Sequence, residues 1–176
     1  MGILLNILIG LVVLIVILAA IGLALPRRVG TERSVTIDAA PEAIFPHLNS
    51  LRRMGDWSPW LGRDPEIVVT HDGPEEGVGA KMAWVSQMRN VGSGKQEITA
   101  SVANERVDTA LDFGSRGTAE ASLALAPDAA GTRVTWSFSS DLGTNPVARW
   151  FGLMIPGFVG KDYEAGLARL KALIEG

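Results

Sequence analysis

The chain begins with an apolar run from Ile3 to Leu25 that contains no charged residue and one strongly polar residue, Asn6. As a helix rising about 1.5 Å per residue, this run reaches roughly 34 Å, enough to cross a hydrocarbon core of about 30 Å. Its leucines, isoleucines and valines leave no polar face, which a helix lying flat on a membrane would need. The sequence therefore predicts a transmembrane anchor over residues 1–26.

A cleaved signal peptide is the alternative interpretation of this run. The tripeptide Gly22-Leu23-Ala24 has the small-x-small form of a cleavage site. Against cleavage, no Lys or Arg precedes the run, its length exceeds the usual apolar region of about 7–15 residues, and Pro26 follows the site directly. We interpret the run as an uncleaved anchor.

The orientation of the anchor depends on the charges that flank it. Arg27, Arg28 and Arg33 follow the run, and no positive charge precedes it. The positive-inside tendency then predicts a single-pass membrane protein whose soluble part lies in the cytoplasm. An extracytoplasmic domain stays open as an alternative, because short uncharged amino-terminal tails weaken this rule.

The charges of the chain all lie after Leu25, so the formal net charge of −3 belongs to the soluble part. That part is long enough for one domain with its own core. Its basic pairs, Arg27-Arg28 and Arg52-Arg53, do not form the positive patch that nucleic-acid binding requires. Without cysteine there is no disulfide and no thiolate-bound zinc. We expect no nucleic-acid partner and no cofactor.

Alternating polar and apolar residues predict strands through most of the soluble part. After a linker over residues 27–30, we expect one domain over residues 31–176. Its long last segment, Asn145 to Ile174, has helical spacing and must kink or divide at Pro156-Gly157. The predicted order is a strand (Arg33–Asp38), one or two short helices (Ala40 to about Trp57), six strands (Ile67–Val69, Met82–Val85, Gln96–Val102, Val107–Phe113, Ala119–Leu125, Val134–Phe138) and the long helix.

This order predicts an α+β helix-grip fold, in which a curved antiparallel sheet of about seven strands surrounds a long carboxyl-terminal helix. The sheet would bend so that its apolar face covers that helix. Such an arrangement leaves room for a cavity between the sheet and the helix.

Two stretches carry a resemblance to a known superfamily: Arg33-Ser34-Val35-Thr36-Ile37-Asp38-Ala39-Ala40-Pro41-Glu42-Ala43-Ile44-Phe45 and Leu51-Arg52-Arg53-Met54-Gly55-Asp56-Trp57-Ser58-Pro59-Trp60. Together with the element order, they resemble the START-like or Bet v 1-like (SRPBCC) superfamily, and in particular bacterial polyketide cyclase/dehydrase-type members. The resemblance covers roughly Thr31 to Glu175. It implies a helix-grip fold whose hydrophobic pocket holds lipids, sterols, polyketides or similar apolar molecules. The motifs are structural, so the resemblance does not by itself imply an enzyme.

Aromatic side chains are the main candidates for ligand contacts, with ordinary core packing as the alternative. Trp84 and Trp136 lie in strand phases that would face the pocket, and Trp57 and Trp60 bracket a rigid turn near its mouth. The predicted ligand-binding residues are Trp57, Trp60, Trp84, Phe113, Trp136, Phe138, Phe151, Met154, Phe158 and His71.

His71 shares strand parity with Ile67 and Val69 and could place a polar group in the pocket. Neither His71 nor His47 has partners at metal-ligand spacing, so we predict no metal site. The Ser139-Ser140-Asp141 run lacks the base and third group of a catalytic triad. We therefore assign no catalytic residue.

The leading hypothesis is a membrane-anchored binding protein for a hydrophobic or amphiphilic small molecule, lipid or polyketide-like, rather than an enzyme. One alternative is a cyclase or dehydratase-type enzyme acting on a polyketide-like substrate, with His71 or a buried carboxylate as its base. Another is a membrane-tethered protein-interaction module whose grip is packed solid.

Overall fold

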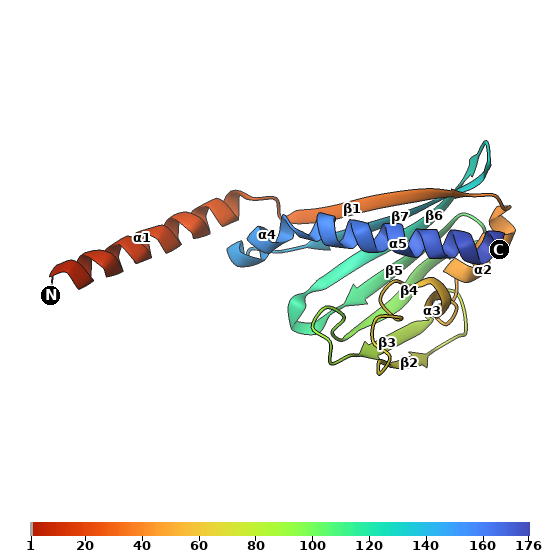
Figure 1. The fold of residues 1–176 in the computed structure, drawn as a ribbon, viewed down its shortest axis with the longest axis horizontal. Helices are drawn as coiled ribbons and strands as arrows, with labels where there is room; N and C mark the ends of the chain where they lie inside the picture. Colours follow the sequence, from red (N-terminus) through yellow and green to blue (C-terminus); the bar gives the residue numbers. More distant parts are fainter. Residues whose placement is uncertain (1) are drawn as a thin grey trace.

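The structure, a computed structural model, describes residues 2–176. A long amino-terminal helix extends away from a domain built of one sheet and several helices (Figure 1). The helices are α1 (Gly2–Ala24), α2 (Pro41–Leu48), α3 (Met54–Trp57), α4 (Pro146–Gly152) and α5 (Ile155–Glu175), with a 3-10 turn η1 (Gly114–Arg116). The strands are β1 (Arg28–Ile37), β2 (Val68–Asp72), β3 (Lys81–Val85), β4 (Gly94–Val102), β5 (Arg106–Asp112), β6 (Thr118–Asp128) and β7 (Gly131–Asp141).

The seven strands form a single antiparallel sheet in the order β1-β7-β6-β5-β4-β3-β2. Each strand from β2 to β7 pairs with the next along the chain, and β1 closes the series beside β7. Helix α5 lies on the inner face of the sheet against β1 and β7, and α3 contacts α5 (Figure 1). The predicted α+β helix-grip fold is confirmed.

The core lies between the inner face of the sheet and α5. Alternate strand residues such as Ile98, Val107 and Val134 are fully buried there, as the period of a half-buried strand requires. On α5, Gly166 lets the helix approach the sheet closely: a Cβ at this position would lie 2.9 Å from the Trp136 ring and 3.1 Å from Pro59. The absence of a side chain at Gly166 therefore allows α5 to pack closely against the Trp136 ring and Pro59.

The start of β1 differs from the predicted linker, whereas the division of the last helical segment next to Pro156 agrees with the break predicted at Pro156-Gly157. Strand β1 begins at Arg28, inside the segment predicted as a linker, because its backbone pairs with β7 from Arg28 opposite Asp141 onward. The long carboxyl-terminal helix is divided between α4 and α5, just before Pro156. Pro156 then lies in the first turn of α5, where its missing N–H would have had no partner within the helix.

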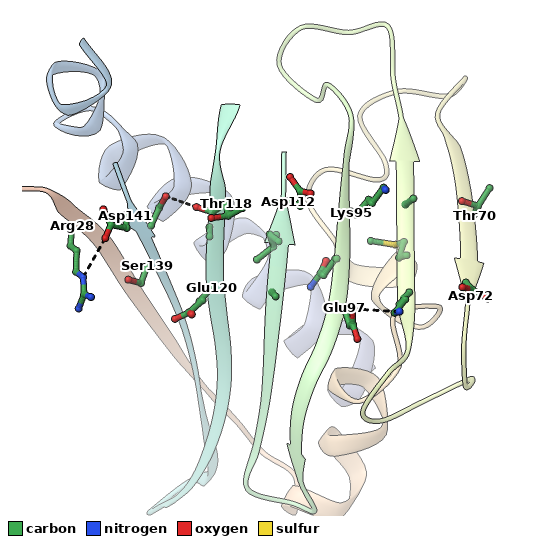
Figure 2. A pocket seen from close by; sticks show the side chains of 18 residues that line it. Arg28, Thr70, Asp72, Lys95, Glu97, Asp112, Thr118, Glu120, Ser139 and Asp141 are labelled. Atoms are coloured by element: carbon green, nitrogen blue, oxygen red, sulfur yellow. Dashed lines mark hydrogen bonds and ion pairs between the residues drawn. The ribbon is translucent and has the colours of Figure 1, made fainter. Parts of the chain in front are cut away.

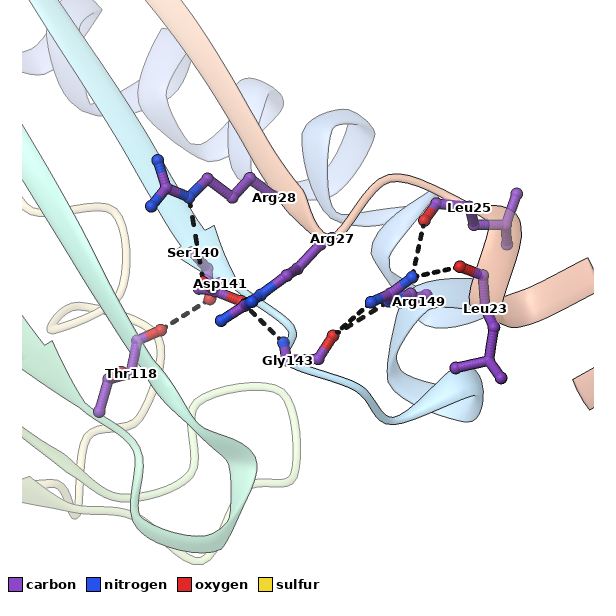
Figure 3. Close-up of polar contacts among 9 residues, drawn as sticks. All are labelled: Leu23, Leu25, Arg27, Arg28, Thr118, Ser140, Asp141, Gly143 and Arg149. Carbon is purple, nitrogen blue, oxygen red and sulfur yellow. Dashed lines mark hydrogen bonds and ion pairs between the residues drawn. The ribbon is translucent and has the colours of Figure 1, made fainter. Parts of the chain in front are cut away.

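Helix α1 is the one helix within residues 2–176 that is long and apolar enough to cross a membrane. Its carboxyl end is fastened to the domain by Arg149 of α4 (Figure 3). The Arg149 guanidinium donates to the carbonyl oxygens of Leu23 and Leu25, the latter at 3.2 Å, and to that of Gly143 at 2.8 and 3.0 Å. The bonds to Leu23 and Leu25 satisfy carbonyls that the end of α1 leaves free.

A second contact stiffens the start of β1. Arg27 Nε donates to Asp141 Oδ1 at 2.7 Å, and Arg28 lies 3.9 Å from the other carboxylate oxygen (Figure 3). The hydrogen bond from Arg27 holds the pKa of Asp141 below its usual value. The connection between α1 and the sheet is therefore short. Arg149 holds it at the end of α1, and the Arg27–Asp141 pair holds it at the start of β1.

His47, on α2, is a half-buried, pH-sensitive group, and its Nδ1 has no hydrogen-bond partner among the described residues. Burial lowers the pKa of His47 below its ordinary 6.5; Arg53 adds to this effect and Asp56 opposes it. The associated stability is complete above pH 6.5 and is lost as the pH falls from there through the lowered pKa. We expect the full-length chain in detergent to unfold at less denaturant at about pH 5.5 than at about pH 7.5. Tryptophan fluorescence would follow this, and a His47→Gln variant that kept the whole difference would contradict it.

Candidate functional site

A cavity of about 310 Å³ lies between the inner face of the sheet and α5. Most of its wall is apolar and comes from the strands, from the segment around α3 and from one side of α5. Asn90, Arg116 and Thr118 also line it and are exposed, so the cavity reaches the surface. The apolar lining residues are Met54, Trp60, Leu61, Met82, Trp84, Val91, Leu111, Phe113, Ala121, Trp136, Phe138, Leu142, Ile155 and Val159.

The cavity occupies the half of the grip nearer to α1. Its lining residues come from the ends of β3, β5 and β7 and from the starts of β4 and β6. Because neighbouring strands are antiparallel, these termini lie at one end of the sheet, the end at which β1 begins. The other half is filled by buried side chains that include Ile37, Ile44, Leu48, Val134 and Leu170.

An aromatic cluster forms the floor of the cavity. Trp136 of β7 stacks on Tyr163 of α5, with ring centroids 3.8 Å apart and planes 8° apart. Trp60 meets both rings edge-on, at 5.7 Å from Trp136 and 6.0 Å from Tyr163. The Trp60 indole N–H donates to Asp162 at 2.9 Å, which holds the ring in place. These rings present a rigid apolar surface to whatever enters.

Few polar groups accompany this surface. Among the described residues that line the cavity, none is an Asp, Glu, His or Lys, and Arg116 is the one with a formal charge. Arg116 Nη2 donates to the Ser93 carbonyl at 3.1 Å, which places the guanidinium at the mouth. Burial raises the pKa of the Tyr163 hydroxyl, so it stays protonated at neutral pH. The lining offers hydrogen bonds and one positive charge, with no carboxylate or imidazole to serve as a base.

A larger hollow, of about 880 Å³, lies on the outer face of the sheet (Figure 2). Most of its side chains belong to outward strand positions, and many of them are charged, with both signs present. Several of them pair with each other, as Lys81 does with Glu97 at 3.7 Å. This hollow is the solvated side of a twisted sheet, and it lacks the apolar wall of a small-molecule site.

Of the ligand-binding residues predicted from the sequence, the structure brings together Trp60, Trp84, Phe113, Trp136 and Phe138 around the cavity. All lie on inward positions or in the segment that follows α3. Strand parity was the signal that identified Trp84, Trp136 and Phe138, because a strand with one buried face alternates its side chains strictly.

The other predicted residues are not among those that line the cavity. Trp57 is fully buried beneath Trp136, 5.1 Å away, and belongs to the core. His71 faces inward on the edge strand β2, outside the lining set. Phe151, Met154 and Phe158 are 66%, 53% and 64% exposed, because they lie on the outer side of α4, of the break that follows it and of the first turn of α5. Helical spacing alone does not tell an inner apolar face from an outer one.

Several lining residues were not singled out from the sequence. Tyr163 shares helical spacing with Leu167 and Leu170, which identified an inward face but not a cavity wall. Gln96 shares strand parity with Ile98, so its inward direction could have been read from that pattern. Arg116 follows no periodic pattern, and only the folded turn η1 brings it to the mouth. Within residues 2–176 there is no group of three His, Cys, Asp or Glu residues that could hold a metal ion.

Comparisons with known proteins agree with this fold. No curated protein matches the chain. Similar solved structures include a protein of unknown function from Staphylococcus aureus, with 16% identity and a TM-score of 0.64 over 84% of this chain and 94% of that one. The Aha1 dimer from Colwellia psychrerythraea has 19% identity and a TM-score of 0.56 over 84% of this chain and 96% of that one.

The di-domain ARO/CYC StfQ from the steffimycin biosynthetic pathway is similar at 10% identity and a TM-score of 0.61, over 84% of this chain and 51% of that one. At such identities these similarities show the fold alone. A family model described as "Polyketide cyclase / dehydrase and lipid transport" matches residues 28–175, from the first residue of β1 to the last of α5. The chain therefore belongs to the polyketide cyclase/dehydrase and lipid transport family.

Proposed function

We propose that this protein is a membrane-anchored binding protein for a hydrophobic or amphiphilic small molecule, lipid or polyketide-like, held in the cavity between the sheet and α5. The observation that carries the proposal is the cavity itself: an aromatic and aliphatic wall with few polar groups, in the half of the grip next to α1. Displacing water from such a wall favours apolar ligands. Its anchor keeps the cavity close to the bilayer, where apolar molecules accumulate.

The volume of the cavity narrows the class of ligand. At about 310 Å³ it stands at the lower end of the range of about 300–1,000 Å³ for ligand pockets. This size suits a single apolar chain or a small ring system. The stacked rings of Trp136 and Tyr163 would contact the apolar part of the ligand, and the mouth would receive its polar end.

The lining residues favour binding over catalysis. A cyclase or dehydratase of the usual kind needs an acid and a base at the substrate. Here the ionisable groups are the Arg116 guanidinium and the Tyr163 hydroxyl, whose pKa is raised by burial. A protein-interaction module would be expected to have a fully packed space between the sheet and α5. This alternative fits less well, because that space contains a cavity.

Native mass spectrometry of the full-length chain tests the proposal. The chain would be extracted with detergent from a lipid-containing membrane and released from its micelle in the gas phase. We expect an adduct of discrete mass that survives removal of the detergent. Recovery of the bare chain alone, together with no affinity for any lipid class added back, would refute the proposed function.

Arg116 should select ligands with an acidic polar end. Replacing it by Gln removes the charge at the mouth, and we expect affinity for a single-chain fatty acid to fall roughly tenfold, with affinity for the matching fatty alcohol unchanged. Quenching of tryptophan fluorescence by the two compounds would measure both affinities. Arg89→Gln is the matched control, since Arg89 is exposed on the neighbouring loop and is not a lining residue. An equal loss for acid and alcohol would contradict a charge role for Arg116.

Arg27, Arg28 and Arg33 follow the proposed membrane span, and positive charges that flank a span tend to stay in the cytoplasm. This supports a cytoplasmic location of the domain. A reporter enzyme that is active only in the cytoplasm, fused after Gly176, should therefore be active. Activity of a periplasm-specific or lumen-specific reporter at the same position would reverse this assignment.

A further inference from the structure

A patch of exposed apolar side chains covers α4 and the first turn of α5. Between residues 146 and 158 the one charged side chain is Arg149, and its guanidinium is turned inward onto backbone carbonyls. A surface helix in water normally shows polar residues on its outer face, so this arrangement is inverted. The members of this α4–α5 patch are Val147, Trp150, Phe151, Leu153, Met154 and Phe158, which are between 38% and 66% exposed.

The patch is continuous with α1. Gly22 is the buried residue of α1, and a Cβ there would lie 2.8 Å from the Cβ of Pro146, so the absence of a side chain lets the two helices touch. Trp150 Nε1 donates to the Leu18 carbonyl at 3.0 Å, and Arg149 holds the carbonyls at the end of α1. Helix α4 therefore packs along the last turns of α1, not beyond its end.

These contacts fix the depth of α4 relative to the bilayer. Leu18 lies about 9 Å along the axis from the end of α1 at Ala24, at about 1.5 Å per residue. Interfacial helices bury their apolar face by about 5–10 Å, and tryptophan is enriched at this level. If α1 spans the membrane, Trp150 and its neighbours already stand at the depth of the headgroup and acyl boundary.

We propose that the α4–α5 patch is a membrane-contact surface that inserts into the interfacial layer of the same bilayer that α1 crosses. The occupant is lipid, because the contacts with α1 bring the patch into the plane where lipid is the surrounding medium. The turn that carries the patch also carries Ile155 and Val159, which line the cavity. One face of this turn thus meets lipid through Met154 and Phe158, and the other face bounds the cavity.

The natural chain has no cysteine, so single spin labels can report on the patch. Leu153→Cys and Phe158→Cys would be labelled in the full-length chain in phosphatidylcholine vesicles. We expect both labels to collide more often with oxygen, which partitions into lipid, than with a water-soluble nickel reagent. Ala129→Cys is the aqueous control, because Ala129 is exposed in the β6–β7 turn at the opposite end of the sheet. Ile15→Cys, within α1, is the lipid control.

The outcomes separate this inference from the proposed function. If the patch labels collide mainly with the nickel reagent, as at Ala129→Cys, while the label at Ile15→Cys collides mainly with oxygen, the proposed membrane contact is wrong. That result would not contradict the anchor or the proposed ligand in the cavity. An aqueous reading at Ile15→Cys would refute the anchor as well. Each chain carries one label, so spectra broadened by a nearby second label would mean that two chains meet at the patch. If this broadening persisted after dilution with excess lipid, a second copy of the chain, and not lipid, would occupy the patch. None of these readings depends on what the cavity binds.

Discussion

Replacing Trp136 with alanine is expected to lower the free energy of unfolding by about 3–5 kcal/mol, the largest loss of stability among the changes considered. Trp136 is 3% exposed and touches Trp57, Trp60 and Tyr163, with the stacked Tyr163 ring 3.8 Å away. Removing the indole leaves a void that the surrounding rings fill only in part, because α5 is already seated closely at Gly166. Denaturant unfolding of the full-length chain in detergent, followed by far-UV circular dichroism, would measure the loss.

Trp150→Ala is the matched control for Trp136→Ala, since it removes the same side chain from an exposed position. Trp150 lies outside the core, so its loss should change the unfolding free energy of the domain by about 0.5 kcal/mol or less in detergent. Equal losses for the two variants would mean that Trp136 is not the centre of the aromatic cluster. That result would also remove the rigid floor that the proposed ligand contacts require.

Filling the cavity should abolish binding without unfolding the domain. Ala121 lies on the inner face of β6 and lines the cavity, so Ala121→Phe would direct a ring into the space that the ligand needs. We expect affinity for the bound molecule to fall at least about tenfold, equivalent to about 1.4 kcal/mol. The added ring enters a void and not a packed core, so the cost of overpacking should stay near the lower end of about 1–3 kcal/mol. Native mass spectrometry would report loss of the adduct, and thermal unfolding would report retention of the fold.

Ala110→Phe is the control for the filled cavity. Ala110 is exposed on the outer face of β5 and lines the outer hollow, so the same ring projects into solvent on the other side of the sheet. It should leave the adduct unchanged. If Ala110→Phe removed the adduct and Ala121→Phe kept it, the ligand would lie on the outer face, and the proposed site would be wrong.

Much of the fold could be predicted because its signals are local. The alternation around Met82 and Trp84, or around Val134 and Trp136, assigns each side chain to one face of a strand without knowledge of the partner strand. The length and apolarity of the Ile3–Leu25 run likewise need no tertiary context. These patterns were sufficient to predict about seven strands in an antiparallel sheet and the closing helix.

The cavity could be predicted only in part, because a burial pattern does not separate a packed core from a hollow. Trp57 and Trp60 lie in one short segment and look equivalent in sequence, yet Trp57 is sealed beneath Trp136 and Trp60 lines the cavity. Arg116 reaches the mouth through a turn with no periodic signal. Such differences depend on which side chains of distant segments meet, and this is set by the packing of the whole domain.

Taken alone, the amino-acid sequence determined the long apolar amino-terminal helix, the strands and the long last helix, since spacing and hydrophobicity along the chain are enough to define them. The tertiary structure decided what each apolar residue faces. Val159 and Phe158 are neighbours on one helix, yet Val159 lines the cavity and Phe158 points outward. The physical reason is that both sides of this helix turn are apolar, so hydrophobicity cannot choose between them. The choice is made by the seating of α5 at Gly166 and the packing of α4 against Gly22.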